Sequence, residues 1–172
     1  HPFSILVFDC ETTGLPSGSY NPHLVQLAWS VHDIQGKKLG EQSHIIRPDG
    51  FDVPEAAARI HGITDARARK EGVPLAQVIK EFLRHTEKSG VRLVAHNMSF
   101  DTRIVAAEIE RLQIKSSFLD LPRYCTMLKT VKVCALPRRG GGCKWPSLQE
   151  LHIYLFGHRF QIQIKLCACV IG

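Results

Sequence analysis

The sequence predicts an α/β fold in which a mixed β-sheet of about five strands is flanked by helices. Two observations lead to this prediction: strand-like segments come first, and strand-like and helix-like segments then alternate along the chain. A length of 172 residues fits one domain, and neither an internal repeat nor a dividing linker is visible. We therefore expect residues 1–172 to form a single domain.

The N-terminal segments are expected to form an antiparallel meander. Ser4–Phe8 is a short apolar run that stops at Asp9, which indicates a buried strand entering a loop. Val25–Val31 alternates apolar and polar residues, as half-buried strands do. A third strand is expected at Ser43–Arg47, after a turn at Gln35–Lys37.

Helices and buried strands are expected to alternate in the rest of the chain. Pro54 and Pro74 each occupy a first helical turn, so a helix should follow each of them. A buried strand, a longer helix, one more strand, a Pro/Gly/Arg loop and a last helix come next. The expected ranges are Glu55–Ile60 and Leu75–Glu87 for the two helices, Val91–Ala95 for the buried strand, a helix from about Ser99 to Leu112, Phe118–Met127 for the further strand, Leu136–Lys144 for the loop and Ser147–Phe156 for the last helix.

Composition excludes some classes of protein. No apolar stretch approaches the roughly 18 residues that a membrane span needs, so we expect no membrane partner. The 6 cysteines lack the density of a secreted disulfide framework. The sequence also has no Cys-x-x-Cys pair of the kind that binds zinc. An intracellular, reducing compartment is therefore favoured. The chain opens His1-Pro2-Phe3 without Met or a secretory signal, so we expect its true start to be trimmed.

Positive charge dominates, because 22 Lys and Arg stand against 16 Asp and Glu, for a net charge of +6. Such a balance suits a nucleic-acid partner without requiring one. Lys129–Lys144 contains no acid, and two interpretations of it stay open: a loop that guides a phosphate backbone, or a solvated connection.

The sharpest local feature is a pair of acids at the end of the first strand, Asp9 and Glu11. Residues two apart on a strand point to the same face, so these side chains can share a ligand. Two neighbouring carboxylates repel each other, and a hard divalent cation relieves this repulsion. An exposed strand-end turn is the alternative, and the Thr-Thr-Gly-Leu that follows weakens it.

Two further segments carry polar residues at element ends. Asp101 lies in the first turn of the helix that follows the Val91–Ala95 strand, where it would also favour the helix dipole, with Asn97 or Ser99 as the helix cap. His61 lies in an Ile-His-Gly-Ile-Thr turn and, taken alone, is a satisfied polar residue.

Together these segments closely resemble the DEDDh family of 3′→5′ exonucleases, the group of the bacterial DNA polymerase III proofreading subunit, ribonuclease T and the oligoribonucleases. The resemblance covers Phe3 to about Phe160. It is carried by Phe8–Leu15, Ile60–Ile63 and His96–Asp101, with Pro146–Leu151 and Leu155–Gly157 in support. It implies a ribonuclease-H-like α/β fold.

In enzymes of this family, two Mg²⁺ or Mn²⁺ ions bridge the scissile phosphate. The resemblance implies that Asp9, Glu11 and Asp101 are the catalytic metal ligands, with Asp9 touching both ions. It also implies a set of residues that hold the 3′-terminal nucleotide: Thr12, Thr13, Leu15, His61, Asn97 and Phe100.

The family's last motif, a fourth acid with a general-base histidine five residues before it, is missing from the sequence. Asp120 is the sole aspartate after Asp101, and it lies upstream of the last helix. Gln163 stands five residues after His158, which we expect to be a surface residue. Residues 161–172 are therefore atypical or truncated. A frameshift, splice variant or similar error that replaced the motif, an incomplete sequence, and a natural loss of catalysis remain as explanations.

The first functional hypothesis is a metal-dependent exonuclease that shortens single-stranded or frayed nucleic acid from its 3′ end, DNA in preference to RNA, and releases nucleoside 5′-monophosphates. The second is a catalytically impaired module with the same fold, which binds nucleic acid or associates with a polymerase. A third, an unrelated hydrolase of small phosphoesters, would cleave a small ester and no oligonucleotide. DNA against RNA and the oligomeric state cannot be read from the sequence.

Overall fold

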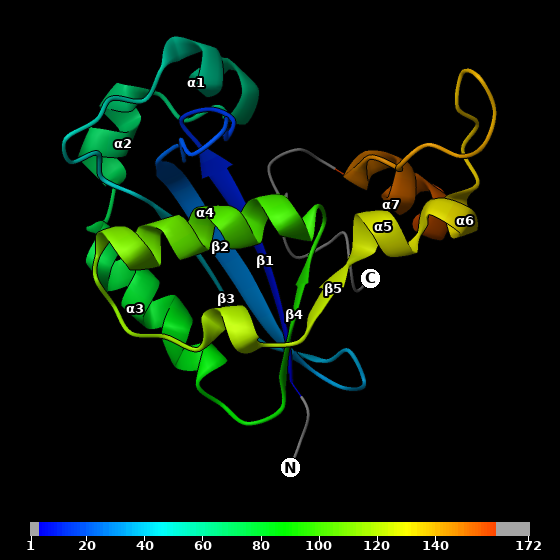
Figure 1. Ribbon diagram of the computed structural model, residues 1–172, viewed down its shortest axis with the longest axis horizontal. Coiled ribbons are helices and arrows are strands. Elements are labelled where there is room, and N and C mark those ends of the chain that lie inside the picture. Colours follow the sequence, from blue (N-terminus) through cyan, green and yellow to red (C-terminus); the bar gives the residue numbers. More distant parts are fainter. Residues whose placement is uncertain (1–3, 161–172) are drawn as a thin grey trace.

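A five-stranded mixed sheet forms the centre of the computed structural model, which describes residues 4–160 (Figure 1). The strands are β1 (Ser4–Thr12), β2 (Leu24–Asp33), β3 (Lys38–Ile45), β4 (Val91–Ala95) and β5 (Arg123–Cys125). Their order in the sheet is β3-β2-β1-β4-β5. β1 pairs antiparallel with β2, and β2 antiparallel with β3, whereas β4 is parallel to both β1 and β5. The predicted mixed sheet with an N-terminal meander is confirmed.

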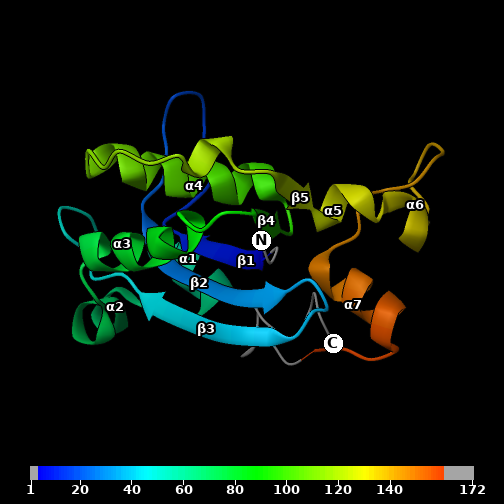
Figure 2. The same ribbon diagram turned by 90° about the horizontal axis from the view of Figure 1, so that it is seen from below.

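Helices lie in the connections between β3 and β4 and between β4 and β5, and they also follow β5 (Figures 1 and 2). They are α1 (Glu55–His61), α2 (Asp65–Glu71), α3 (Leu75–Thr86), α4 (Met98–Arg111), a 3₁₀ turn at Phe118–Asp120, α5 (Thr126–Lys129), α6 (Val131–Cys134) and α7 (Leu148–Phe156). In both views α5, α6 and α7 lie together at one end of the molecule, and α1 and α2 lie at the other end.

Four aromatic rings hold α3 and the 3₁₀ turn against the sheet. Phe82 of α3 lies 5.4 Å from Phe8 of β1 and 5.5 Å from Trp29 of β2, measured between ring centroids. Phe118 lies 6.0 Å from Phe8 and 5.9 Å from Phe82. All four side chains are fully buried, so this cluster fixes the layer that supports β1.

The first strand is longer than the sequence predicts. It continues past Asp9 to Thr12, because its pairing with β2 extends to Leu24. The third strand begins earlier than predicted, at Lys38, and ends at Ile45. Its residues are mostly exposed and polar, as is common for an edge strand, so they show little apolar alternation.

The helix α2 is absent from the prediction, which has two helices where the structure has three. Only Ala68 of this helix is buried, so its sequence has no apolar periodicity to detect. It is held instead by a cap from the Thr64 hydroxyl and by ion pairs four residues apart, Arg67–Glu71 and Arg69–Asp65.

The predicted strand Phe118–Met127 is mostly wrong. Its first residues form the 3₁₀ turn, only Arg123–Cys125 pair with β4, and α5 begins at Thr126. The short α6 was also not predicted. The other expected helices and the strand Val91–Ala95 are confirmed, with helix ends that agree within a few residues.

Candidate active site at the end of the central strand

Asp9 and Glu11 lie on β1 beyond the point where its parallel neighbour ends. The pairing of β1 with β4 stops at Val7, so the rest of β1 extends past the carboxyl end of β4. Phe8 and Cys10 point into the core, and alternation along the strand therefore puts both carboxylates on the opposite face. Carboxyl ends of parallel strands are where ligands bind in open α/β sheets.

Asp101 reaches this strand from the first turn of α4. Its Oδ1 accepts a hydrogen bond from the backbone N–H of Cys10 at 2.9 Å, and the side chain is only 1% exposed. Burial and then the negative charge of Asp9 raise the pKa of Asp101 well above its usual range, although hydrogen bonding to Cys10 opposes them.

Nearby negative charge also acts on the thiol of Cys10, which lies between Asp9 and Glu11 in the sequence. Burial raises the pKa of its thiol well above the usual range. The negative charges of three carboxylates raise it further: Asp101, Asp9 and Glu11. Asp9 and Glu11 are the sequence neighbours of Cys10, so the effect that comes from across the fold is that of Asp101, whose carboxylate lies beside this segment of β1.

The chemistry of these donors fits a hard divalent cation, since carboxylate oxygens are the preferred ligands of Mg²⁺ and Mn²⁺. A cation would also relieve the repulsion between Asp9 and Asp101. Within residues 4–160, however, no group of three or more His, Cys, Asp and Glu side chains is arranged so that it could hold a metal ion. The carboxylates therefore form an incomplete ligand set in the described part of the chain.

Thr12 and Thr13 form the neck of the loop that follows β1. The Thr12 hydroxyl donates to the carbonyl of Gly14 at 2.6 Å. The Thr13 hydroxyl accepts from the N–H of His23 at 3.0 Å, and the Thr13 N–H donates to the His23 carbonyl at 2.9 Å. Leu15, which is expected to help hold the terminal nucleotide, is 78% exposed on this loop.

His61 is the last residue of α1, and its Nδ1 accepts from the N–H of Ile63 at 3.1 Å. Because that nitrogen accepts, the proton of a neutral ring sits on Nε2. The turn needs Gly62, which has φ 77°. His61 therefore has a local structural role, and its contact with a nucleotide stays a prediction.

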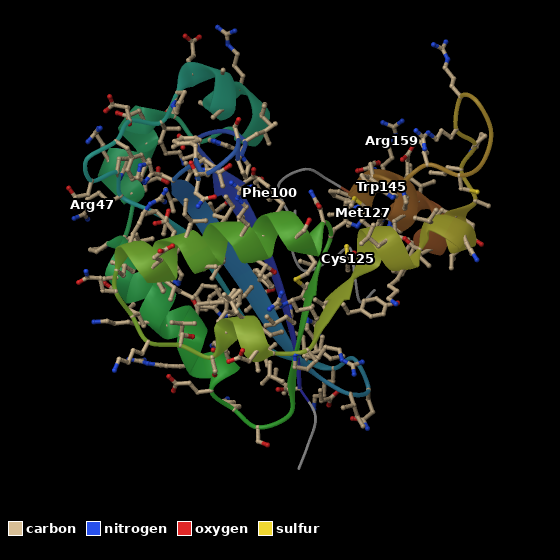
Figure 3. The ribbon with its side chains drawn as sticks, viewed as in Figure 1. Arg47, Phe100, Cys125, Met127, Trp145 and Arg159 are labelled. Atoms are coloured by element: carbon tan, nitrogen blue, oxygen red, sulfur yellow. The ribbon has the colours of Figure 1, made fainter. Side chains whose placement is uncertain are left out.

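Asn97 precedes α4 in the left-handed conformation, with φ 76°. Neither its side chain nor that of Ser99 caps the helix; the Ser99 hydroxyl donates instead to Asn97 Oδ1 at 3.3 Å. The expectation of a side-chain cap is thus wrong, because a left-handed residue does not place its side chain over the first turn. Phe100 is partly buried against the core, at the end of α4 that lies nearest to α5 and α7 (Figure 3).

The residues near the missing last motif lie where the sequence predicts. His158 is exposed, and Glu150 lies inside α7, where it forms a capping box with Ser147 and an ion pair with Lys144 at 2.5 Å. Asp120 is exposed in the 3₁₀ turn. Gln163 and the rest of 161–172 lie outside the described residues.

His96 connects the segment before α4 to the segments that begin α5 and α7, a role that the sequence analysis did not predict. Its Nε2 lies 3.0 Å from the carbonyl of Pro146, just before α7, and its Nδ1 lies 3.0 Å from the hydroxyl of Thr126 at the start of α5. Burial lowers its pKa, which the bond to Pro146 opposes. Nothing in the sequence alone predicts these contacts, because they join segments 30 and 50 residues apart.

The five-stranded mixed sheet with its flanking helices is an α/β fold of the ribonuclease-H-like type, and comparison with known proteins identifies the class as exonuclease. The family model of the RNase_T exonucleases matches residues 6–158. The chain therefore belongs to this exonuclease family. None of the helices within residues 4–160 combines the length and the apolar content that crossing a bilayer demands.

Similar proteins include parts of larger replication proteins. The chain is 38% identical over 106 residues to the PolC-type DNA polymerase III of Streptococcus sanguinis, which covers 62% of the chain and 7% of that protein. It is 37% identical over 100 residues to a DNA polymerase III subunit epsilon-like protein of Rhodobacter capsulatus, covering 57% of the chain and 13% of that protein. The chain thus spans only a small part of these relatives.

Solved structures of exonuclease I share the fold. A product-bound exonuclease I superposes with a TM-score of 0.81 at 17% identity, over 99% of this chain and 42% of that chain. Exonuclease I of E. coli in complex with a dT13 oligonucleotide superposes with a TM-score of 0.76 at 18% identity, over 93% of this chain and 37% of that chain. At such identity the likeness establishes the fold.

Proposed function

We propose that this chain is a metal-dependent 3′→5′ exonuclease, which removes nucleoside 5′-monophosphates from the 3′ end of single-stranded or frayed nucleic acid, DNA in preference to RNA. The observation that carries the proposal is the hydrogen bond from the Cys10 N–H to Asp101, which brings this carboxylate of α4 to the segment of β1 that bears Asp9 and Glu11. Membership of the exonuclease family and the dT13 complex of an exonuclease with this fold support it.

Asp9, Glu11 and Asp101 are the residues that would hold two Mg²⁺ or Mn²⁺ ions. Such ions, when bound, supply a hydroxide nucleophile and stabilise the departing 3′ oxygen. The chain itself contributes the placement of the carboxylates: Asp101 is fixed on β1 through the Cys10 N–H, at 2.9 Å. A carboxylate that is already held in place needs little rearrangement during the reaction, so little free energy is spent on moving it.

The six expected substrate residues lie at the end of β1 and on the loop after it, at the end of α1 and at the start of α4. We propose that the exposed Leu15 meets the terminal base, because a flat, sequence-independent apolar contact suits a single-stranded end. Thr12, Thr13, His61, Asn97 and Phe100 would surround the same nucleotide.

A second candidate function is binding of a nucleic-acid end without turnover, by a module that serves a polymerase. The incomplete ligand set within residues 4–160 favours it, because a two-metal reaction needs a full set of carboxylates. The PolC-type and epsilon-like names of the relatives are the reason to consider a polymerase as partner.

A labelled oligonucleotide separates the two candidates. The chain is incubated with a 5′-labelled single strand and Mg²⁺ or Mn²⁺, beside EDTA and Asp9→Asn controls. Asp49→Asn is the matched control variant, because Asp49 is exposed and lies on a bend outside the segments that carry the three carboxylates. A ladder that shortens from the 3′ end and is lost with EDTA and in Asp9→Asn supports the exonuclease; retained binding without a ladder supports the binding module.

A further inference from the structure

The loop that carries Leu15 is closed at its base and folded upon itself. Thr13 and His23 exchange two hydrogen bonds across its neck. Further out, Ser17 and Tyr20 pair through both backbone groups, at 3.1 and 2.8 Å. Residues 14–22 therefore form a compact projection rather than an open connection, and it presents two largely exposed side chains, Leu15 (78%) and Tyr20 (56%).

Arg103 of α4 fastens this loop from the side. Its Nε donates to Asn21 Oδ1 at 2.6 Å, and one terminal nitrogen donates to the carbonyls of Gly18 and Tyr20 at 2.7 and 3.1 Å. A guanidinium can do this because its donors diverge in a fixed plane, whereas a lysine presents one point charge. Three loop residues are thus held by one side chain.

Arg111, two turns further along α4, holds the end of the same loop. It donates to the carbonyls of Pro22 (3.2 Å) and Asn21 and pairs with Glu108 at 2.8 Å. Glu108 is 1% exposed, and its Oε1 also accepts from the Leu24 N–H at 2.8 Å. A buried carboxylate is costly unless it is paired, and here its contacts all serve the junction between the loop and β2.

α4 also carries Asp101, two residues before Arg103. The helix therefore joins the carboxylate site and the loop through one rigid element. We propose that Arg103 is a positioning residue, which fixes the loop 14–22 on α4 so that Leu15 and Tyr20 grip the nucleic-acid end at a set place relative to Asp101. This inference rests on the proposed function, since it assigns the loop to the same substrate.

A loop fixed before binding loses less conformational entropy when it takes up a ligand. Arg103 does not contact the carboxylates in any of its three hydrogen bonds, so its removal should weaken substrate capture and leave the chemical step nearly unchanged. We expect Arg103→Ala to raise KM for a single-stranded oligonucleotide about tenfold, the size of effect of charged hydrogen bonds, with kcat changed less than about twofold.

The experiment compares Arg103→Ala with Arg103→Lys and with the control Arg84→Ala. Arg84 is exposed on α3, so its removal changes the net charge equally without touching the loop. Arg103→Lys should give an intermediate KM, because an ammonium reaches fewer of the three acceptors at once. Thermal unfolding is measured for each variant, and Arg103→Lys decides the question if Arg103→Ala does not fold.

Binding of a 5′-fluorescein-labelled dT oligonucleotide, measured by fluorescence anisotropy, gives a second readout that does not need turnover. An Arg103→Ala variant whose KM and dissociation constant equal those of Arg84→Ala, or whose kcat falls while KM stays constant, overturns the inference while the proposed function stands. A parent chain that neither cleaves nor binds the oligonucleotide overturns both.

Discussion

Replacing His96 tests how the C-terminal helices are attached to the carboxylate-bearing segment. The carbonyl of Pro146 can only accept, so Nε2 of His96 carries the proton and donates at 3.0 Å. Nδ1 then accepts from the Thr126 hydroxyl at 3.0 Å. In His96→Ala this hydroxyl still has the carbonyl of Ala95, 3.4 Å away, whereas the buried Pro146 loses its donor.

The expected loss of stability in His96→Ala follows from these contacts. One buried carbonyl is left unpaired and a partly buried ring is removed, so we expect the free energy of unfolding to fall by about 2 kcal/mol. For a domain of this size, such a loss lowers Tm by roughly 4–8 °C. Thermal unfolding followed by circular dichroism measures the change.

A pH dependence gives the sharper test. Because burial lowers the pKa of His96, the unfolded chain binds a proton more readily than the folded one. The stability from the neutral ring is therefore present above the unfolded pKa of about 6.5 and is lost as pH falls towards the lower folded pKa. Between about pH 7.5 and about pH 5.5 the parent chain should lose more stability than His96→Gln, which cannot titrate.

The His96 reasoning would be refuted by an unchanged Tm in His96→Ala, or by equal losses with falling pH in the parent chain and in His96→Gln. Other histidines with lowered pKa values, His23 and His85, are present in both proteins, so their contribution cancels in this comparison.

Three other predictions concern single side chains. Glu108→Ala should lower the free energy of unfolding by about 3 kcal/mol in urea titrations, because Arg111 and a backbone N–H lose a buried partner; a change below about 0.5 kcal/mol, the size typical of a surface substitution, would contradict it. Leu15→Ala should leave stability within about 0.5 kcal/mol, since the side chain is 78% exposed, yet weaken oligonucleotide binding several-fold in anisotropy titrations; unchanged binding would count against its role as a wedge. The Cys10 thiol, whose pKa is raised by burial, should react with a thiol reagent only on unfolding, whereas the exposed Cys143 reacts in the folded protein; mass spectrometry of the labelled peptides would show the opposite order if this is wrong.

Much of the fold could be predicted from local patterns. The strand Val91–Ala95 and the helix after it are continuous apolar or periodic segments whose burial dictates their type. The helix α2 could not be predicted in this way, because it is held by ion pairs and a cap on the surface. The start of the edge strand β3 could not be placed either, since its polar residues follow the backbone of β2 rather than an apolar pattern.

The candidate site, like the fold, could be predicted only in part from the sequence. Asp9 and Glu11 could be assigned to one face from their spacing alone, and Asp101 joined them through the family resemblance. The hydrogen bond between Asp101 and Cys10 spans 91 residues of sequence, so only the folded chain shows why that carboxylate is buried. Glu108 is an acid at a buried position of α4, and its contacts with the loop appear only in the folded chain.

The central claim is that the carboxylates at the end of β1 cut nucleic acid with the help of divalent ions. The most direct test is the length of a 5′-labelled single strand after incubation with the chain and Mn²⁺. We predict a ladder of products shortened from the 3′ end, absent with EDTA and in Asp9→Asn and present in Asp49→Asn. An intact strand with the parent chain, or an equal ladder with Asp9→Asn, would contradict the claim.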